Sequence, residues 1–310
     1  MFHFLSLVAS GLYVIGLSDA ACNASKYTLT PFAGAGTKGF ADGPRLAALF
    51  AEPQGLAFDG HDLFVADTSS NRIRRVSATD VSTLPSVLRQ PRSVTTDARY
   101  GVVVADYGNH MLRALNGSDA VDLAGTLGLG PGFADGPAAS AQFHNPSGVA
   151  VARDGAIYVA DSSNNRIRKL SADRSTVTTV AGSATSGDDD GNAATFNVPT
   201  DLVLHRNALY ITDLNNHAIR LLDLSTNEIS TLDFDAELKY PHGIACDSCG
   251  NLYVADTYNN RVLKIDPVSG AVVVLGDVES PVGVAVSAKD GSVYVSSPSL
   301  QQILRLAPSA

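Results

Sequence analysis

The sequence predicts an all-β fold, a six-bladed β-propeller whose ring is closed by an N-terminal strand. Three observations support this prediction. A short motif that begins with proline recurs six times. Further segments follow each copy in which β-branched and small residues alternate as in a strand, and no stretch shows sustained helical spacing. A unit of four short strands in about 40 residues cannot bury its faces alone, so the copies must pack against one another around an axis.

Each repeat opens with a short apolar strand that starts at a proline. The six prolines are Pro53, Pro91, Pro146, Pro199, Pro241 and Pro281. A turn and a second apolar strand follow, and this strand ends in aspartate in every copy except the last, which has Ser297. The aspartates are Asp67, Asp106, Asp161, Asp213 and Asp256. A polar turn then leads to a third strand, such as 166–170, and a fourth strand, such as 176–181, completes most units.

The two ends of the chain complement each other. The last repeat stops after its third strand. The segment 27–34 reads as a strand that belongs to no repeat, and its sequence is similar to that of the fourth strand at 176–182. Pairing the two ends would complete the last blade and remove exposed strand edges that invite aggregation. We therefore expect the propeller to occupy residues 27–310.

The first residues are expected to direct export. An apolar run extends from Phe4 to Leu17, and Ser18 and Ala20 place small residues at the −3 and −1 positions of a cleavage site. The run is shorter than the roughly 20 residues that span a bilayer. Residues 1–20 are thus predicted to be a signal peptide, with an uncleaved anchor or a buried strand as the alternative. The protein is expected to be secreted or to reside in the secretory lumen.

Sequons and cysteines fit an exported protein. Asn23 and Asn116 each begin an N-x-S triplet, so both are predicted glycosylation sites. Cys246 and Cys249 are two residues apart across a predicted turn, and we predict a local disulfide between them in an oxidising compartment. Cys22 lies just past the cleavage site, and the C-x-x-C pair alone is too small a set to hold zinc.

The repeats resemble the NHL family. The shared features are the P-x-G-[VIL]-A entry, the Y-V-A-D strand and the N-N-R-[IV] that follows, best seen in 161–167 and 256–262. The resemblance covers nearly the whole chain and implies a six-bladed propeller. It implies no single function, because the family includes protein-binding modules, RNA binders, sensor domains and an amidating lyase.

Strand order predicts which face of the propeller binds ligands. In an antiparallel blade, the proline entries, the turns after the aspartates and the connections between blades emerge at one end, which we call the long-loop face. Three connections, 34–52, 125–145 and 182–198, are long and share an Asp-Gly pair and a phenylalanine near their ends. Binding residues accumulate in loops on rigid scaffolds, so we expect binding on this face.

The residue after each proline is expected to ring the mouth of the central channel on this face. The predicted ligand-binding residues are Gln54, Arg92, Ser147, Thr200 and His242, and Val282 completes the ring. Arg92 and His242 are the members able to carry positive charge, which favours a small polar or anionic ligand. The alternative is a mouth that holds only water.

The sequence therefore favours a non-catalytic extracellular binding or scaffold protein that recognises a protein or a small polar ligand. The net charge of −9 disfavours nucleic acid as a partner, no membrane span is expected, and a monomer is predicted. No cofactor is predicted, although the run Asp188–Asp190 could bind calcium weakly. The repeated aspartates are interpreted as structural acceptors for backbone amides of the next turn.

The alternative function is that of a propeller enzyme, either a metal-dependent lyase or a lactonase-like hydrolase. His242 occupies an entry position that resembles a zinc-ligand position of the family's lyase. The other entries lack histidine, so the three-histidine set is absent at matching positions. The remaining histidines are expected in turns or loops and are not expected to converge: His61, His110, His144, His205 and His217.

Overall fold

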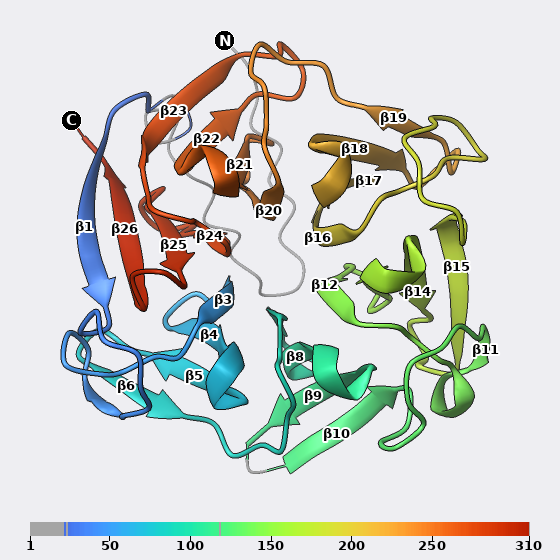
Figure 1. Cartoon of the computed structure of the whole chain (residues 1–310), viewed down its shortest axis with the longest axis horizontal. Helices are drawn as coiled ribbons and strands as arrows, with labels where there is room; N and C mark the ends of the chain where they lie inside the picture. Colours follow the sequence, from blue (N-terminus) through green and yellow to red (C-terminus); the bar gives the residue numbers. More distant parts are fainter. Residues whose placement is uncertain (1–21, 23, 118, 310) are drawn as a thin grey trace, which may run out of the picture.

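The computed structural model describes residues 22, 24–117 and 119–309, which form six antiparallel sheets around a central axis (Figure 1). Each sheet is one blade, and the strand that follows the recurrent proline lies nearest the axis. This confirms the all-β, six-bladed propeller. The predicted signal peptide, residues 1–20, and the sequon residue Asn23 lie outside the described residues. None of the described helices is long and apolar enough to cross a membrane.

The blades are numbered in chain order. Blade 1 contains β2 (Gly43–Pro44), β3 (Pro53–Phe58), β4 (Leu63–Asp67), β5 (Arg72–Val76) and β6 (Asp80–Thr83). Blade 2 contains β7 (Ser93–Asp97), β8 (Gly101–Asp106), β9 (Met111–Asn116) and β10 (Asp119–Ala124). Blade 3 contains β11 (Gly136–Pro137), β12 (Pro146–Val151), β13 (Ile157–Asp161), β14 (Arg166–Leu170) and β15 (Thr176–Gly182).

Blade 4 contains β16 (Pro199–His205), β17 (Ala208–Asp213), β18 (Ala218–Asp223) and β19 (Ile229–Thr231). Blade 5 contains β20 (Pro241–Cys246), β21 (Leu252–Asp256), β22 (Arg261–Ile265) and β23 (Val272–Asp277). Blade 6 contains β24 (Val284–Val286), β25 (Val293–Ser297), β26 (Gln302–Pro308) and β1 (Tyr27–Ala33). Single 3₁₀ turns are Thr68–Ser70, Tyr107–Asn109, Ala138–Ser140, Ser162–Asn164, Leu214–Asn216 and Thr257–Asn259.

The N-terminal strand closes the ring, as the two chain ends predicted. β1 pairs antiparallel with β26 from Tyr27 opposite Pro308 to Ala33 opposite Ile303. The outermost strand of blade 6 therefore comes from the start of the chain, and its other three strands come from the end (Figure 1).

Close packing of the inner strands explains the glycine in the proline entry. A Cβ atom added at Gly55 would lie 2.6 Å from the carbonyl oxygen of Arg92, and one at Gly283 would lie 2.1 Å from that of Gln54. Real Cβ atoms do not approach a backbone oxygen so closely, so neighbouring inner strands can meet at these positions because the entry has no side chain there.

The strand-end aspartates accept a backbone amide from the connection that leads into their own blade, whereas the sequence led us to expect backbone amides of the following turn. Asp161 is fully buried, and its Oδ1 accepts the amide of His144, two residues before the blade's proline, at 2.7 Å. Its Oδ2 accepts the side-chain amide of Asn164 at 2.9 Å. The equivalent amide donors to Asp67, Asp106, Asp213 and Asp256 are those of Ala51, Arg89, Asn197 and Lys239.

A second repeated hydrogen bond joins each blade to the next. The residue after each 3₁₀ turn between the second and third strands, or its equivalent in blade 6, has a positive φ, and its side chain accepts the amide of the residue before the next proline. The acceptor–donor pairs are Asn71–Gln90, His110–Asn145, Asn165–Val198, His217–Tyr240, Asn260–Ser280 and Gln301–Glu52. Asparagine suits the left-handed conformation, and the two histidines use Nδ1 in place of the amide oxygen.

The three long connections are fixed by a buried arginine from the third strand of the blade they enter. In blade 3, Arg168 is fully buried and donates to Asp161 Oδ2 at 2.7 Å and to Asp135 Oδ1 at 2.6 Å. It also donates to the carbonyl oxygens of Gln142 and Ala134 at 3.1 and 2.8 Å. Arg74 in blade 1 and Arg220 in blade 4 repeat this arrangement. These connections are therefore fixed parts of the scaffold.

Candidate functional site

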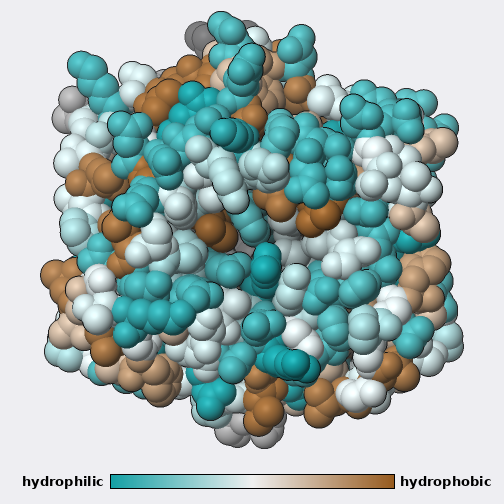
Figure 2. Space-filling view, in the orientation of Figure 1, coloured by the Kyte–Doolittle hydropathy of each residue, from teal (hydrophilic) through white to brown (hydrophobic). Residues whose placement is uncertain are grey.

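The six post-proline residues, which were predicted to ring the channel mouth, lie at the starts of the inner strands, where the backbones of neighbouring blades meet, and their side chains differ in exposure. Ser147 and Thr200 are each only 3% exposed. Thr200 Oγ1 donates to the carbonyl oxygen of His242 at 3.2 Å, so this hydroxyl joins blade 4 to blade 5. Gln54, Arg92 and His242 remain partly exposed. Figure 2 shows the centre of the disc hollowed and surrounded mostly by hydrophilic and neutral surface.

Arg92 is the cation of this mouth. Its guanidinium carbon lies 4.3 Å above the centre of the Tyr107 ring, which belongs to the 3₁₀ turn of the same blade. Its Nε is buried without a hydrogen-bond partner, and no ion pair joins its side chain to any residue in the described parts of the chain. A partly buried guanidinium in this state is ready to receive an anionic oxygen.

His242 does not supply the positive charge expected of it. Burial lowers the pKa of His242 to about 3, and the Arg92 charge adds to this lowering. The imidazole is therefore neutral at physiological pH. Because protonating it would place a second cation beside Arg92 in a poorly solvated position, only Arg92 can offer charge to an anion here.

A cavity of about 290 Å³ continues along the axis beneath the mouth and is lined by all six inner strands. It contains one acidic side chain, Asp201, which occupies a position that is glycine in four of the other entries. Burial raises the pKa of Asp201 to about 7, although its Oδ2 accepts the amide of Ile244 at 3.1 Å. The residues predicted to bind ligand were those directly after each proline, so the prediction missed Asp201. The sequence does mark this residue, because an acid stands there in place of the glycine of the P-x-G motif.

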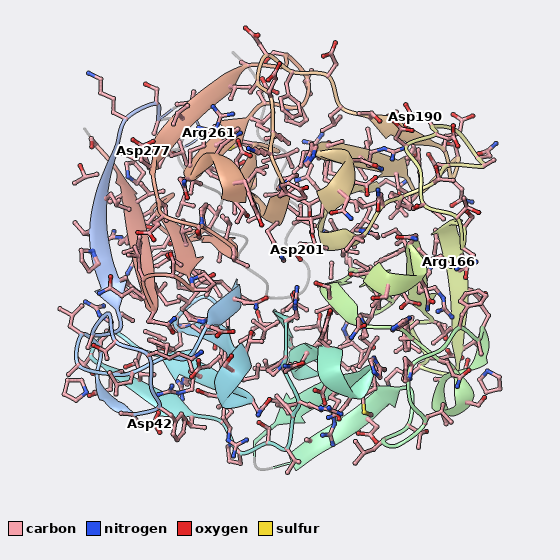
Figure 3. All side chains as sticks on the ribbon, viewed as in Figure 1. Asp42, Arg166, Asp190, Asp201, Arg261 and Asp277 are labelled. Atoms are coloured by element: carbon pink, nitrogen blue, oxygen red, sulfur yellow. A yellow bond between two sulfur atoms is a disulfide. The ribbon has the colours of Figure 1, made fainter. Side chains whose placement is uncertain are left out.

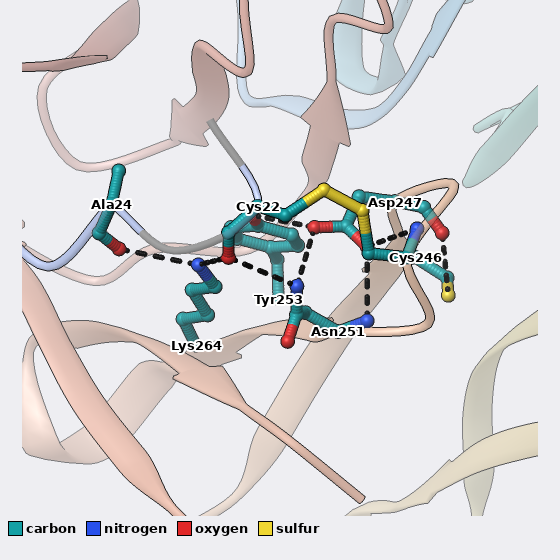
Figure 4. The surroundings of a disulfide bond; sticks show 8 residues. Cys22, Ala24, Cys246, Asp247, Asn251, Tyr253 and Lys264 are labelled. Carbon is teal, nitrogen blue, oxygen red and sulfur yellow. Dashed lines mark hydrogen bonds between the residues drawn. A yellow bond between two sulfur atoms is a disulfide. The ribbon is translucent and has the colours of Figure 1, made fainter. Parts of the chain in front are cut away.

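The disulfide differs from the predicted Cys246–Cys249 pair. Cys22 is bonded to Cys249, with Cα atoms 6.2 Å apart, and Cys246 is a free thiol (Figure 4). Asp247 Oδ1 accepts the amides of Cys249 and Asn251 at 2.9 Å each, which shapes the turn between them. Cys246 packs with the apolar core shared by blades 4 and 5, whereas Cys249 is exposed and meets the N-terminal segment. The local prediction was wrong because the two thiols face different neighbours.

Further polar contacts anchor the N-terminal segment on the short-turn face, which is the end of the disc opposite the long-loop face. Lys264 Nζ donates to the carbonyl oxygens of Cys22 and Ala24, the latter at 3.2 Å (Figure 4). Asn251 donates to the carbonyl oxygen of Cys22 at 3.3 Å. Burial lowers the pKa of Lys264 and raises that of the Cys246 thiol to about 12. A protonated thiol is a poor nucleophile, so Cys246 is an inert core residue.

The histidines are distributed differently from the expectation in two respects. The rings of His110 and His144 meet edge to face with centroids 5.8 Å apart, and His205 ends β16 instead of lying in a loop. Burial lowers the pKa of His110, and His144 and Arg89 add to this effect. Since the His110 Nδ1 is already an acceptor for a backbone amide, this pair has a structural role.

Potential metal ligands come together at one place in the described residues. In that part of the chain, one group of three metal-binding side chains has its ligand atoms within 4.8 Å of one another, namely Cys22, Asp247 and Cys249. Two of these sulfur atoms share the disulfide. In the acidic run, Asp190 accepts from Arg220 and Asp189 accepts from Thr195, while Asp188 is exposed. Asp189 and Asp190 therefore serve the blade 4 connection, and their carboxylates do not converge on a cation position.

Comparison with known proteins identifies the repeats. The NHL repeat model matches residues 143–170 and 238–265. The chain is 30% identical over 193 residues to NHL repeat-containing protein 2 of Homo sapiens, covering 59% of this chain and 22% of that protein. It is 29% identical over 227 residues to Protein SUPPRESSOR OF QUENCHING 1, chloroplastic, of Arabidopsis thaliana, covering 71% of this chain and 18% of that protein. The chain thus spans about a fifth of the length of these curated relatives.

Solved structures share the fold at low identity. An auxiliary nutrient binding protein of Bacteroides ovatus superposes with a TM-score of 0.70 at 16% identity, covering 92% of this chain and 78% of that chain. A gluconolactonase of Xanthomonas campestris superposes with a TM-score of 0.71 at 15% identity, covering 95% and 94%. At this identity the likeness concerns the fold alone. The repeats and the six blades together make this chain an NHL-repeat β-propeller.

Proposed function

We propose that this NHL-repeat propeller is a non-catalytic extracellular binding protein that holds an anionic group, such as the carboxylate of a small ligand, at the channel mouth on its long-loop face. The observation that carries this proposal is the unpaired guanidinium of Arg92, stacked on Tyr107. Desolvating a guanidinium without a counter-charge is costly, and a carboxylate would offset that cost with charge-assisted hydrogen bonds.

The contrast with the structural arginines supports this assignment. Arg74, Arg168 and Arg220 are fully buried, and each pairs with two carboxylates. Arg92 is only partly buried, and it has no carboxylate partner among the described residues. Its place near the axis, where inner strands of several blades converge, suits a small ligand that can enter the hollow of the disc.

The disulfide between Cys22 and Cys249 supports an oxidising, extracellular location, since such bonds persist mainly outside the cytosol. The signal peptide over residues 1–20 and glycosylation at Asn23 and Asn116 remain predictions of the same location. We also propose that the protein acts as a monomer.

The proposal is tested by calorimetric titration with acetate, succinate and citrate as probes. Arg92→Ala should weaken binding of the best probe about 10- to 150-fold, which corresponds to about 1.5–3 kcal/mol for a hydrogen bond to a charged group. The affinity of Arg92→Lys for the probe should lie between those of the wild type and Arg92→Ala, because lysine keeps the charge but lacks the planar guanidinium. Arg89→Ala is the matched control, since Arg89 is an exposed arginine on the connection into the same blade.

Equal affinity of the wild type and Arg92→Ala would contradict the proposal, as would equal losses in Arg92→Ala and Arg89→Ala. The enzymatic alternative is tested separately by metal analysis of the purified protein, where stoichiometric zinc or calcium would favour it.

A further inference from the structure

The third residue of each proline entry faces the inner strand of the next blade. It is glycine in four blades, Ser93 in blade 2 and Asp201 in blade 4. A Cβ at Gly243 or Gly283 would lie 2.2 or 2.1 Å from a neighbouring carbonyl oxygen, so no side chain fits there. Between blades 4 and 5 the strands leave room for a carboxylate, and Asp201 lies close to the axis of the disc (Figure 3).

The axial cavity that contains Asp201 has walls of two kinds. Most of the surface that reaches the cavity is polar, although apolar residues also line it. Each inner strand has a sheet partner on one side only, so the edge that faces the axis presents backbone carbonyl and amide groups. The cavity of about 290 Å³ follows the inner strands to their ends at the short-turn face.

The carboxylate in this cavity lacks a counter-charge. Asp201 Oδ2 accepts the amide of Ile244, and the backbone amide of Leu202 also hydrogen-bonds to this carboxylate. No cationic side chain of the described residues pairs with it. The other ionisable groups at the channel are Arg92 and His242 at the mouth and Cys246 in the wall. With the pKa of His242 lowered to about 3 and that of Cys246 raised to about 12, both are neutral at physiological pH. Arg92 belongs to the mouth on the long-loop face and forms no ion pair with Asp201.

We propose that the axial cavity binds the primary ammonium group of a small organic cation, with the Asp201 carboxylate as its counter-charge. An ammonium group has three N–H donors, which match the remaining lone pairs of the Asp201 carboxylate and the carbonyl oxygens of the inner-strand edges. A short alkyl chain would contact the smaller, apolar part of the cavity lining. This site differs from the Arg92 site in the sign of its ligand and in its place beneath the mouth.

The test uses n-butylammonium chloride as the probe in calorimetric titration at about pH 8, above the raised pKa of Asp201. Asp201→Asn keeps a side-chain oxygen for the Ile244 amide but removes the charge, so the inner strands should stay in place. Asp188→Asn makes the same charge change at an exposed acid and serves as the control. Wild type and Asp188→Asn should bind the probe saturably, Asp201→Asn should bind at least tenfold more weakly, and n-butanol should not bind.

Protonation gives a second measurement. Because burial raises the pKa of Asp201 to about 7, affinity for butylammonium should fall about tenfold per pH unit below that value and level off above it. Carboxyl resonances in NMR spectra of the wild type should also show the pKa of Asp201 fall when the probe is added.

Equal binding by wild type and Asp201→Asn would overturn the proposal, and so would the absence of saturable binding at a large molar excess of the probe over millimolar protein. Binding of calcium without butylammonium would overturn it as well. If Asp201→Asn fails to fold, the NMR titration of the wild type decides, and an Asp201 pKa that does not respond to the probe would equally overturn the proposal.

Discussion

Blades 1, 3 and 4 differ from blades 2, 5 and 6 in how the chain enters them. The first group is entered by long connections that a fully buried arginine holds through two carboxylates and two carbonyl oxygens, as Arg168 does in blade 3. The second group is entered by short connections, and the equivalent third-strand positions hold Arg113, Leu263 and Leu304. Arg113 pairs with the partly exposed Asp122 at 2.9 Å.

The difference shows that the long connections in this protein are held rigidly by their own blades. The buried arginines of these blades bind carbonyl and carboxylate groups of the long connections, and β2 and β11 within two of the connections pair with the outer strands β6 and β15. Buried nitrogen atoms without a hydrogen-bond partner among the described residues also occur there, namely Nε of Arg45, Arg74 and Arg220. Arg92 and the neutral His242 both belong to blades with short connections, and Asp201 of blade 4 lies on the inner strand and not in the long connection.

The largest expected effect tests the buried arginine. Arg168→Met should destabilise the protein by about 3–5 kcal/mol, because it leaves the buried Asp161 without its counter-charge. Arg113→Met, the matched change in a blade with a short connection, should cost about 1 kcal/mol or less. Urea denaturation measures both. Similar losses for the two variants would remove the distinction between the two groups of blades.

The second prediction concerns the N-terminal anchor of blades 5 and 6, which lack a buried arginine at the equivalent third-strand position. Replacing Cys22 and Cys249 together with serine should reduce the free energy of unfolding by about 2–4 kcal/mol, because the bond closes most of the chain into a loop. Cys246→Ser is the control and should leave the disulfide intact. Peptide mapping by mass spectrometry should find the Cys22–Cys249 bond, and a Cys246–Cys249 bond would show this pairing to be wrong.

The third prediction concerns Asp201, the acid that blade 4 has where four other blades have glycine. The folded-state pKa of Asp201, about 7, lies above the unfolded value of about 3.9. Its protonated form therefore contributes stability below about pH 4 that is lost as pH rises through 7. Asp201→Asn should be more stable than wild type by about 4 kcal/mol at about pH 8, because the shift is about three pKa units and each unit is worth about 1.4 kcal/mol, with the difference vanishing near pH 4. Thermal unfolding across this range measures it, and a constant difference would contradict the shift.

The smallest effect concerns the hydrogen bond that both groups of blades share. The folded-state pKa of His110 is lowered. The hydrogen bond to its Nδ1 therefore stabilises the protein fully above about pH 6.5, and this stabilisation is lost as pH falls through the lowered pKa. His110→Asn should remove this loss, a change of about 1 kcal/mol or less. Asn165→His is the converse variant, and it should introduce a similar loss of stability at low pH in blade 3. Melting temperatures from about pH 7.5 to about pH 5 test both, and parallel profiles would refute the role.

The sequence by itself determined the architecture of the protein. Six proline phrases, a strand-end acid and an incomplete last repeat predict the blades and the closure by 27–34, because these features report local strand and turn preferences that recur in register. The asparagines after the turns were likewise predictable, since a left-handed residue is needed at each. The acid in place of glycine at Asp201 was visible too, although only the packing of inner strands shows why the position is exceptional.

The tertiary structure alone decided which polar groups are occupied. The sequence shows Arg74, Arg113 and Arg168 at the same position of the third strand. Arg74 and Arg168 pair with carboxylates 32 and 33 residues away, whereas Arg113 pairs with a carboxylate 9 residues away. The sequence also shows Cys246 and Cys249 as neighbours, yet Cys249 bonds to a cysteine 227 residues earlier. Hydrogen bonds, counter-charges and pKa values depend on atoms that meet in space, and repeats alike in sequence receive different neighbours once the ring has closed.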